Sequence, residues 1–154
     1  MKPINVGEFL KSLDSPFRAV TVSETATLQE VTAALLEARE QRYAYVVDEE
    51  GRLCGIISVG QLARHLLHEE IAPSSGFAPS TDILHYLTAE HARDIMEKRI
   101  VCCRLDETLD AAARKMLGKK IYKTLPVVDD AMHLVDLISV VSILEFGLNN
   151  GEKS

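Results

Sequence analysis

The sequence has no tryptophan, only eight other aromatic residues, and three cysteines among 154 residues. Cys54, Cys102 and Cys103 are an odd number, adjacent cysteines rarely bridge each other, and no Cys-x-x-Cys pair is present. These features exclude a disulfide framework and a cysteine metal site of the usual spacing. We therefore expect reduced thiols in a cytoplasmic protein.

The chain also lacks a surplus of positive charge and a long apolar run. Its 17 basic and 23 acidic residues give a net charge of −6, which argues against a general DNA- or RNA-binding protein. No apolar run approaches the roughly 18 residues of a membrane span, and the start has no secretory hydrophobic region. We expect neither a nucleic-acid partner nor membrane insertion.

The chain has enough aliphatic residues to form one compact core, and this composition excludes a disordered protein. Its charge is uneven. From Lys98 to Lys123 eight basic residues stand against three acidic ones, so this segment carries +5 and the remainder −11. The basic segment offers a local site for an anion.

An internal repeat organises the sequence. With a shift of 81, Val20–Leu62 aligns with Val101–Ile143 without a gap, and 11 of the 43 positions are identical. The identities include Val46-Val47-Asp48 with Val127-Val128-Asp129, and Ile57-Ser58-Val59 with Ile138-Ser139-Val140. A lead-in segment recurs at a shift of 86, where Val6–Leu10 aligns with Ala92–Met96. The sequence thus divides into repeat 1 (6–67), a linker (71–91), repeat 2 (92–148) and a tail (149–154).

Each repeat predicts the order strand, helix, strand, strand, helix. In repeat 1 the capping-box pattern Thr27-x-x-Glu30 starts a helix, which apolar residues at helical spacing continue. The expected strands and final helix are Val20–Val22, Tyr43–Val47, Leu53–Ile57 and Gly60–Leu67. In repeat 2 we expect strands at Ile100–Cys103, Leu125–Val128 and Leu134–Ile138, a helix from Thr108, and a final helix near Val140. Two such units packed sheet to sheet bury both sheets and create clefts between the repeats.

The motifs resemble the CBS domain. Arg93-Asp94-Ile95-Met96 and Leu125-Pro126-Val127-Val128-Asp129 carry the resemblance, with Gly55-Ile56-Ile57-Ser58 in repeat 1. The chain looks like a stand-alone CBS pair, or Bateman module. The resemblance implies an α/β (α+β) fold of tandem β-α-β-β-α repeats with pseudo-twofold symmetry, often assembled as a homodimer. It also implies a regulatory protein that is not an enzyme and has no catalytic or metal site.

The resemblance further implies an adenine nucleotide (AMP, ADP or ATP) or related adenosyl compound as a regulatory ligand in the clefts, with no required cofactor. Ser58 and Ser139 occupy the positions that contact ribose or phosphate. The family's ribose-binding Asp, three residues later, is replaced by Gln61 and Ser142. Losing that carboxylate weakens binding by about tenfold or more, because a charged hydrogen bond contributes about 1.5–3 kcal/mol. The candidate ligand-binding residues are Thr21, Val22, Tyr45, Ser58, Gln61, Cys103, Lys123, Leu125, Pro126, Ser139 and Ser142.

Several of these residues have a simpler structural interpretation. Ser58 and Ser139 can act as helix N-caps, and Tyr45 can pack in the core instead of stacking on a base. Lys123, with Lys119 and Lys120, can neutralise a phosphate or merely complement a helix C-terminus. His65 and His68 stand three apart without a third metal ligand, which favours an exposed helix end.

Two other functions remain open at this stage. One is a structural dimerisation or protein-interaction module without a nucleotide. The other is an enzyme fragment that uses Cys102 and Cys103, although a predicted buried strand argues against reactive thiols.

Overall fold

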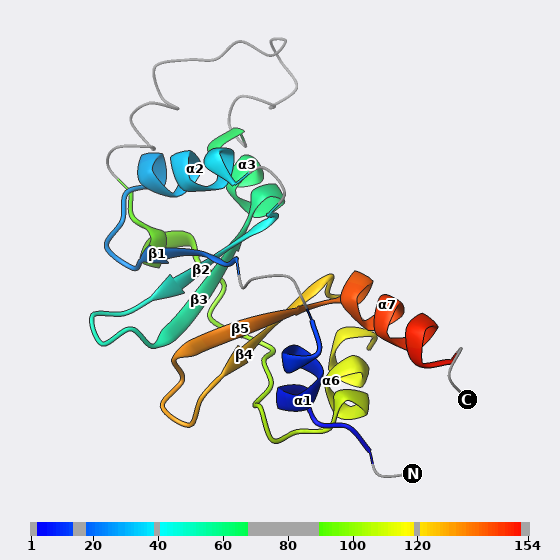
Figure 1. The fold of residues 1–154 in the computed structure, drawn as a ribbon. Coiled ribbons are helices and arrows are strands. Elements are labelled where there is room, and N and C mark those ends of the chain that lie inside the picture. Colours follow the sequence, from blue (N-terminus) through cyan, green and yellow to red (C-terminus); the bar gives the residue numbers. More distant parts are fainter. Residues whose placement is uncertain (1–2, 14–17, 39–40, 68–89, 119–120, 152–154) are drawn as a thin grey trace. The chain divides into compact units, whose positions relative to one another are not determined.

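The computed structural model describes residues 3–13, 18–38, 41–67, 90–118 and 121–151 (Figure 1). The chain forms two compact units: unit 1 combines Met1–Arg18 with Val101–Ser154, and unit 2 is Ala19–Ile100. The lead-in of each repeat therefore belongs to the unit built by the other repeat. The α+β architecture of two repeats is confirmed.

Unit 2 contains a three-stranded sheet of order β1-β2-β3, with β1 (Val20–Ser23) parallel and β3 (Leu53–Ser58) antiparallel to β2 (Tyr43–Val47). Helices α2 (Leu28–Glu37) and α3 (Val59–Leu67) pack against this sheet (Figure 1). The short helix α5 (Ala92–Ile95) contacts β3. The core of the unit consists of Val20, Val22, Ala26, Leu28, Val31, Leu35, Ala44, Val46, Ile57, Leu62 and Ala92.

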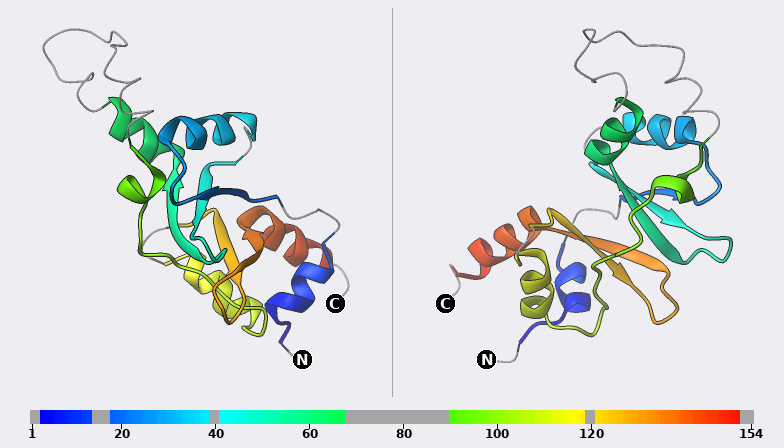
Figure 2. Two further views of the ribbon diagram at one scale, coloured as in Figure 1. Left: turned by 90° about the vertical axis from the view of Figure 1, so that its left-hand side faces the viewer. Right: turned by 180° about the vertical axis from the view of Figure 1, so that it is seen from behind.

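Unit 1 is built on the antiparallel pair β4 (Thr124–Val128) and β5 (Leu134–Ser139). Helix α1 (Val6–Lys11) lies beside α6 (Leu109–Met116), as Figure 2 shows, and α7 (Val140–Gly151) follows β5 directly. The core of the unit consists of Val6, Phe9, Cys103, Leu109, Ala112, Met116, Leu125, Val127 and Ile138. Phe9 and Phe146 meet edge to face with ring centroids 5.3 Å apart.

The helix starts follow from their capping residues. The Thr27 hydroxyl accepts a hydrogen bond from the Glu30 amide, and the Glu30 carboxylate accepts one from the Thr27 amide, which completes the predicted capping box. At the equivalent start in repeat 2, Thr108 Oγ1 accepts from the Ala111 amide at 3.1 Å. The helices predicted from Thr27 and from Thr108 are confirmed.

The strand predicted at Ile100–Cys103 is wrong. Cys103 forms only an isolated parallel bridge with Val127, in which its amide donates to the Pro126 carbonyl and its carbonyl accepts from the Val128 amide. The next bond of such a ladder needs an amide N–H at position 126 as the donor to Val101. Proline has no N–H, so the ladder stops at Cys103.

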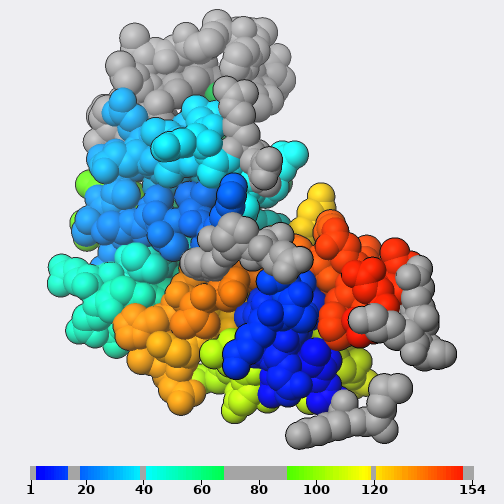
Figure 3. Space-filling model, viewed as in Figure 1, coloured from blue at the N-terminus to red at the C-terminus, as the bar shows by residue number. Residues whose placement is uncertain are grey.

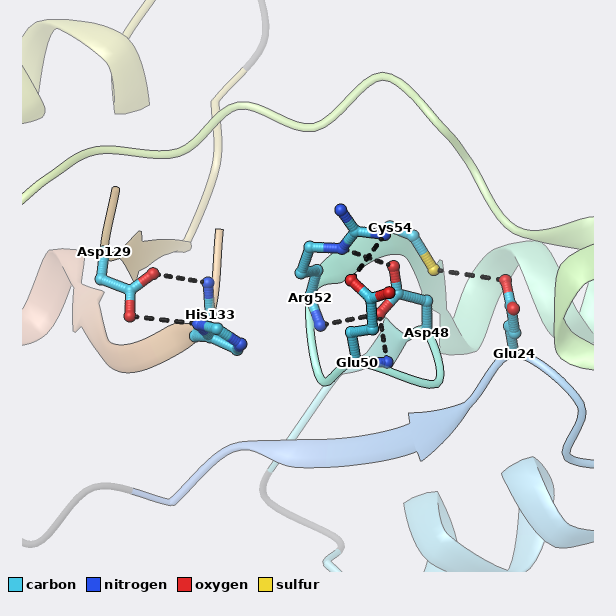
Figure 4. A network of polar contacts seen from close by, with 7 residues as sticks. All are labelled: Glu24, Asp48, Glu50, Arg52, Cys54, Asp129 and His133. Carbon is cyan, nitrogen blue, oxygen red and sulfur yellow. Dashed lines mark hydrogen bonds and ion pairs between the residues drawn. The ribbon is translucent and has the colours of Figure 1, made fainter. Parts of the chain in front are cut away.

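The two hairpin turns repeat each other closely (Figure 4). Asp48 Oδ1 accepts from the amides of Glu50 and Arg52, and Asp129 Oδ1 accepts from those of Ala131 and His133. These amide donors hold the pKa of both carboxyl groups below its ordinary value. The left-handed position of the turn is Gly51 in repeat 1, with φ 81°, and Met132 in repeat 2, with φ 67°.

The lead-in segments dock by three equivalent backbone hydrogen bonds in each unit. In unit 1 these bonds run from Val6 to Glu107, from Gly7 to Leu105 and from Leu109 to Ile4 (amide to carbonyl). In unit 2 they run from Ala92 to Ala26, from Arg93 to Glu24 and from Leu28 to Glu90. The internal symmetry of the molecule thus includes an exchange of lead-ins.

Most of the predicted linker (71–91) lies outside the described residues. Helix α7 continues to Gly151, so the first residues of the predicted tail are helical. Among the helices described, none is long and apolar enough to cross a membrane.

Candidate functional site

Ser58 and Ser139 stand where β3 and β5 end and where α3 and α7 begin. Ser58 Oγ accepts from the Gln61 amide at 3.0 Å, and Ser139 Oγ accepts from the Ser142 amide at 3.0 Å. Each hydroxyl therefore satisfies an amide of the first helical turn. Both side chains are half-buried, so capping does not seal them from a ligand.

The residues three positions later behave differently in the two repeats. Gln61 Nε2 donates to the Ile95 carbonyl and ties α3 to the end of α5 within unit 2. Ser142 Oγ lies 2.8 Å from Ser139 Oγ, so repeat 2 presents a pair of hydroxyls that can both donate and accept. The partner of Gln61 escaped sequence reasoning because the repeat alignment does not show that lead-ins are exchanged.

Tyr45 and Pro126 occupy equivalent positions in β2 and β4. Both are buried, with Tyr45 only 1% exposed, and both alternate with core residues of their strand. Alternation places them on the face opposite the core of their own unit. A residue that flanks adenine and a residue that only packs against its neighbours would both lie on this face.

The remaining candidates separate into core and surface. Val22, Leu125 and Cys103 belong to the core clusters of their units. Thr21 and Lys123 are exposed. The Lys123 carbonyl accepts from the Val140 amide at 3.0 Å, which places this lysine at the entry of α7 beside Ser139. Lys119 and Lys120 lie outside the described residues.

The thiols of the three cysteines are partly or fully buried, and the described histidine candidate, His65, pairs with an acid. Burial raises the pKa of the Cys103 thiol to about 12, and it also raises the pKa of Cys54 and Cys102. Such thiols are protonated near neutral pH and react slowly. His65 Nε2 pairs with Glu90 at 2.6 Å, and His68 lies outside the described residues. Searched over its described part, the chain has no cluster of metal-binding residues.

Comparison with known proteins matches this geometry to one family. The family model described as "CBS domain" matches residues 10–68 and 92–149, which together are most of the chain. The magnesium transporter MgtE of Thermus thermophilus is 31% identical over 130 residues, covering 82% of this chain. The chain spans only 24% of the length of that transporter.

Solved structures agree with the family model. The cytosolic domain of the Mg²⁺ channel MgtE in complex with ATP is 30% identical, with a TM-score of 0.61, over 83% of this chain and 44% of that one. The CBS-pair protein CBSX2 of Arabidopsis thaliana covers 99% of this chain and 100% of its own, with a TM-score of 0.71. At 19% identity the latter shows the fold alone.

Proposed function

Because the chain belongs to the CBS-domain family and is a regulatory CBS pair, we propose that it senses an adenine nucleotide and signals to a partner protein. The observation that carries this proposal is the ATP complex of the MgtE cytosolic domain, which is 30% identical to this chain. That similarity extends over most of both repeats. ATP is therefore the first ligand to test, followed by ADP and AMP.

Repeat 2 offers the better groups for a phosphorylated ligand. The Ser139–Ser142 hydroxyl pair lies at the start of the 12-residue helix α7, where the helix dipole favours an anion. Lys123, exposed at the same end of the hairpin, supplies a positive charge. Pro126, on the face of β4 opposite the core of its unit, supplies an apolar group on the same strand. These observations support binding of the ribose or phosphates at repeat 2.

The proposed affinity is lower than that of a site with the ribose carboxylate. A serine hydroxyl offers a neutral hydrogen bond, worth about 0.5–1.5 kcal/mol, where a carboxylate would offer about 1.5–3 kcal/mol. Gln61 Nε2 already donates to the Ile95 carbonyl, which leaves Oε1 to accept one neutral hydrogen bond from a ribose hydroxyl. Repeat 1 has no counterpart of the Ser139–Ser142 hydroxyl pair. We therefore expect one principal nucleotide site, at repeat 2.

A thermal unfolding assay with AMP, ADP, ATP, NAD and S-adenosylmethionine tests this function. Ligand at 100 times its dissociation constant stabilises the folded chain by about 2.7 kcal/mol, which raises the midpoint by several degrees. Lys123→Gln is expected to reduce the ATP shift, and Lys98→Gln, an exposed lysine of unit 2, is the matched control. No shift with any of the five compounds would contradict nucleotide sensing.

A specific surface supports a second function, dimerisation without a nucleotide. Val141, Leu144 and Leu148 are 63%, 66% and 67% exposed and recur at helical spacing along α7. An exposed apolar stripe of this kind suits a self-complementary interface between two copies of the chain. Sedimentation of the wild type and of Leu144→Glu tests it: a dimer that Leu144→Glu converts to a monomer, with or without ATP, supports this interface.

A further inference from the structure

The outer edges of β3 and β5 are equivalent in sequence but differ in the structure. In unit 2 the segment that follows α5 runs antiparallel along β3. The Ile56 amide donates to the Glu97 carbonyl at 3.0 Å, and the Glu97 amide donates to the Ile56 carbonyl at 2.9 Å. The edge of β3 is therefore covered by the chain's own extended backbone.

At the equivalent place in unit 1, helix α1 continues to Lys11, so the counterpart of Glu97 is helical instead of extended. Within the described residues β5 forms no bridge like that of Ile56 with Glu97. The amide of Leu137, the counterpart of Ile56, instead donates to the carboxylate of Asp136 at 2.7 Å. A side chain of β5 thus satisfies the donor that a docked strand satisfies in unit 2.

A groove of about 570 Å³ lies beside Leu137, between α1 and the residues Val135 and Asp136 of β5. In Figure 3 the surfaces of α1 (dark blue), the β4–β5 hairpin (orange) and the segment around residue 105 (yellow-green) adjoin on the face toward the viewer. The lining residues are Asn5, Gly7, Glu8, Leu10, Lys11, Leu105, Asp106, Val135 and Asp136. All of them belong to unit 1.

The side chains at the edges of β3 and β5 differ, and this difference indicates what kind of ligand would bind in the groove. In unit 2 the Met96 side chain fills the space over Gly55, where even a Cβ would collide with it. In unit 1 the counterpart of that glycine is Asp136, a half-buried acid whose pKa burial raises. With Glu8 and Asp106, the groove carries three acids against one lysine, Lys11.

We propose that the outer edge of β5, which no described residue bridges, binds an extended peptide segment of a partner protein, with a lysine or arginine of that segment facing Asp136. The backbone of the segment pairs with Leu137 as Glu97 pairs with Ile56. Its carbonyl takes over the Leu137 amide, which releases the Asp136 carboxylate to pair with the cationic side chain. The apolar stem of that side chain packs on Leu10, Leu105 and Val135.

This interaction does not depend on the proposed nucleotide. An exposed strand edge presents backbone donors and acceptors that a peptide satisfies and that a small cation does not. The carboxylates add charge-assisted hydrogen bonds that select a basic residue over an apolar one. The covered edge of unit 2 supplies both the backbone geometry and the template for a probe.

The probe is a fluorescein-labelled, capped peptide with the chain's own sequence Met96–Val101, which follows α5 and contains the bridging residue Glu97. It is made with the unchanged sequence and with Met96→Arg or Met96→Glu. Fluorescence anisotropy with the full chain measures the binding of each. We expect the Met96→Arg peptide to bind at least tenfold tighter than the unchanged peptide, and the Met96→Glu peptide to bind weakest. Asp136→Asn in the protein is expected to abolish the preference for arginine.

Two further variants separate this site from general attraction of positive charge. Glu145→Gln, which removes an exposed charge on α7, is expected to leave all affinities unchanged. Asp136→Gly gives this position the residue that repeat 1 has at the equivalent position, Gly55. It is expected to shift the preference from the Met96→Arg peptide to the unchanged one. A two-dimensional amide NMR spectrum is expected to show the Leu137 signal moving with the Met96→Arg peptide.

Four outcomes would overturn the proposal. The first is no binding of any peptide up to about 1 mM, and the second is equal affinity of the three peptides. The third is arginine amide competing as strongly as the peptide, because this would make the groove a small-cation site. The last is self-association that Asp136→Asn weakens, because a second copy of the chain would then occupy the edge.

Discussion

At the scale of single residues, the two hairpin turns differ at the position that requires a positive φ. Gly51 adopts φ 81° without a steric penalty, whereas Met132 adopts φ 67° with one. Met132→Gly is expected to stabilise the fold by up to about 1 kcal/mol, since relief of a strain of about 1–2 kcal/mol exceeds the entropic cost of glycine. Urea unfolding measures this change.

The reciprocal substitution, in the turn of repeat 1, is the control. Gly51→Ala places a Cβ at the same kind of position and is expected to destabilise the fold by about 1 kcal/mol. If Met132→Gly were destabilising by more than this amount, contacts of the methionine side chain would outweigh the backbone strain.

A second prediction at this scale concerns Asp136. Its folded-state pKa is raised because it is half-buried, so the fold favours the protonated acid. The resulting cost is absent below the ordinary carboxyl pKa of about 4 and complete once the pH exceeds the raised pKa. Asp136→Asn is therefore expected to increase the free energy of unfolding at pH 7, with the gain disappearing toward pH 4 and below.

Denaturant unfolding across that pH range measures this gain. Glu145→Gln, at an exposed position of α7, is the matched charge-removing control. A gain for Asp136→Asn that stays constant from pH 3 to pH 7 would show that ionisation is not its cause.

At the scale of elements, the contact of α5 with β3 depends on a missing side chain. A Cβ on Gly55 would overlap the side chain of Met96. Gly55→Ala is expected to destabilise the fold by about 1–3 kcal/mol, the usual cost of overpacking. Met96→Ala added to Gly55→Ala removes the contacts with Met96 Sδ and Cγ and leaves only the one with Cβ at 2.9 Å. The double variant should therefore be more stable than the sum of the two single effects predicts.

Thermal unfolding of the four proteins in this cycle gives the coupling energy. A coupling near zero would mean that the segment after α5 does not dock on β3 as the structure has it. The control is the cycle of Asp136→Ala and Leu10→Ala, at the positions of unit 1 equivalent to Gly55 and Met96. Neither substitution there adds atoms, so no collision is created or relieved.

Local chemistry decided which elements were predictable from the sequence. The capping box at Thr27 and the cap at Thr108 are signals within four residues, and both helices start where these signals predict. The strand at Ile100–Cys103 has suitable residues, but its ladder depends on a donor that the distant Pro126 does not have. The residue pattern of 100–103 alone does not show that the neighbouring strand lacks this donor.

At the scale of the whole molecule, the exchange of lead-ins makes unit 1 depend on residues at the start of the chain. Phe9 is fully buried in unit 1 and stacks edge to face on Phe146. Phe9→Ala is expected to cost about 3–5 kcal/mol. Hydrogen exchange read by mass spectrometry should show the loss of protection in residues 101–151, far along the sequence from the substitution.

Leu36→Ala, at an exposed position of α2, is the control and should leave exchange unchanged. Loss of protection confined to residues 19–67 after Phe9→Ala would contradict the composition of the units. The sequence alone could not predict this exchange, because the lead-ins are similar enough that either could dock on either repeat.

The candidate site was predictable at the same scale only in part. The 81-residue repeat brings Ser58 and Ser139 to equivalent strand ends, and this follows from the alignment. The engagement of Gln61 by Ile95 and the open edge at Asp136 follow from how the lead-ins dock, which no pattern in the sequence encodes. The structural differences between the two proposed sites arise mainly there.

The central claim, nucleotide sensing at repeat 2, is tested most directly by isothermal titration of ATP into the wild type and into Ser142→Asp. The new carboxylate can accept hydrogen bonds from both ribose hydroxyls, so we expect the dissociation constant for ATP to fall about tenfold. The affinity for 2′,3′-dideoxy-ATP should not improve. Failure of both proteins to bind ATP, or an equal gain for the dideoxy analogue, would contradict the account.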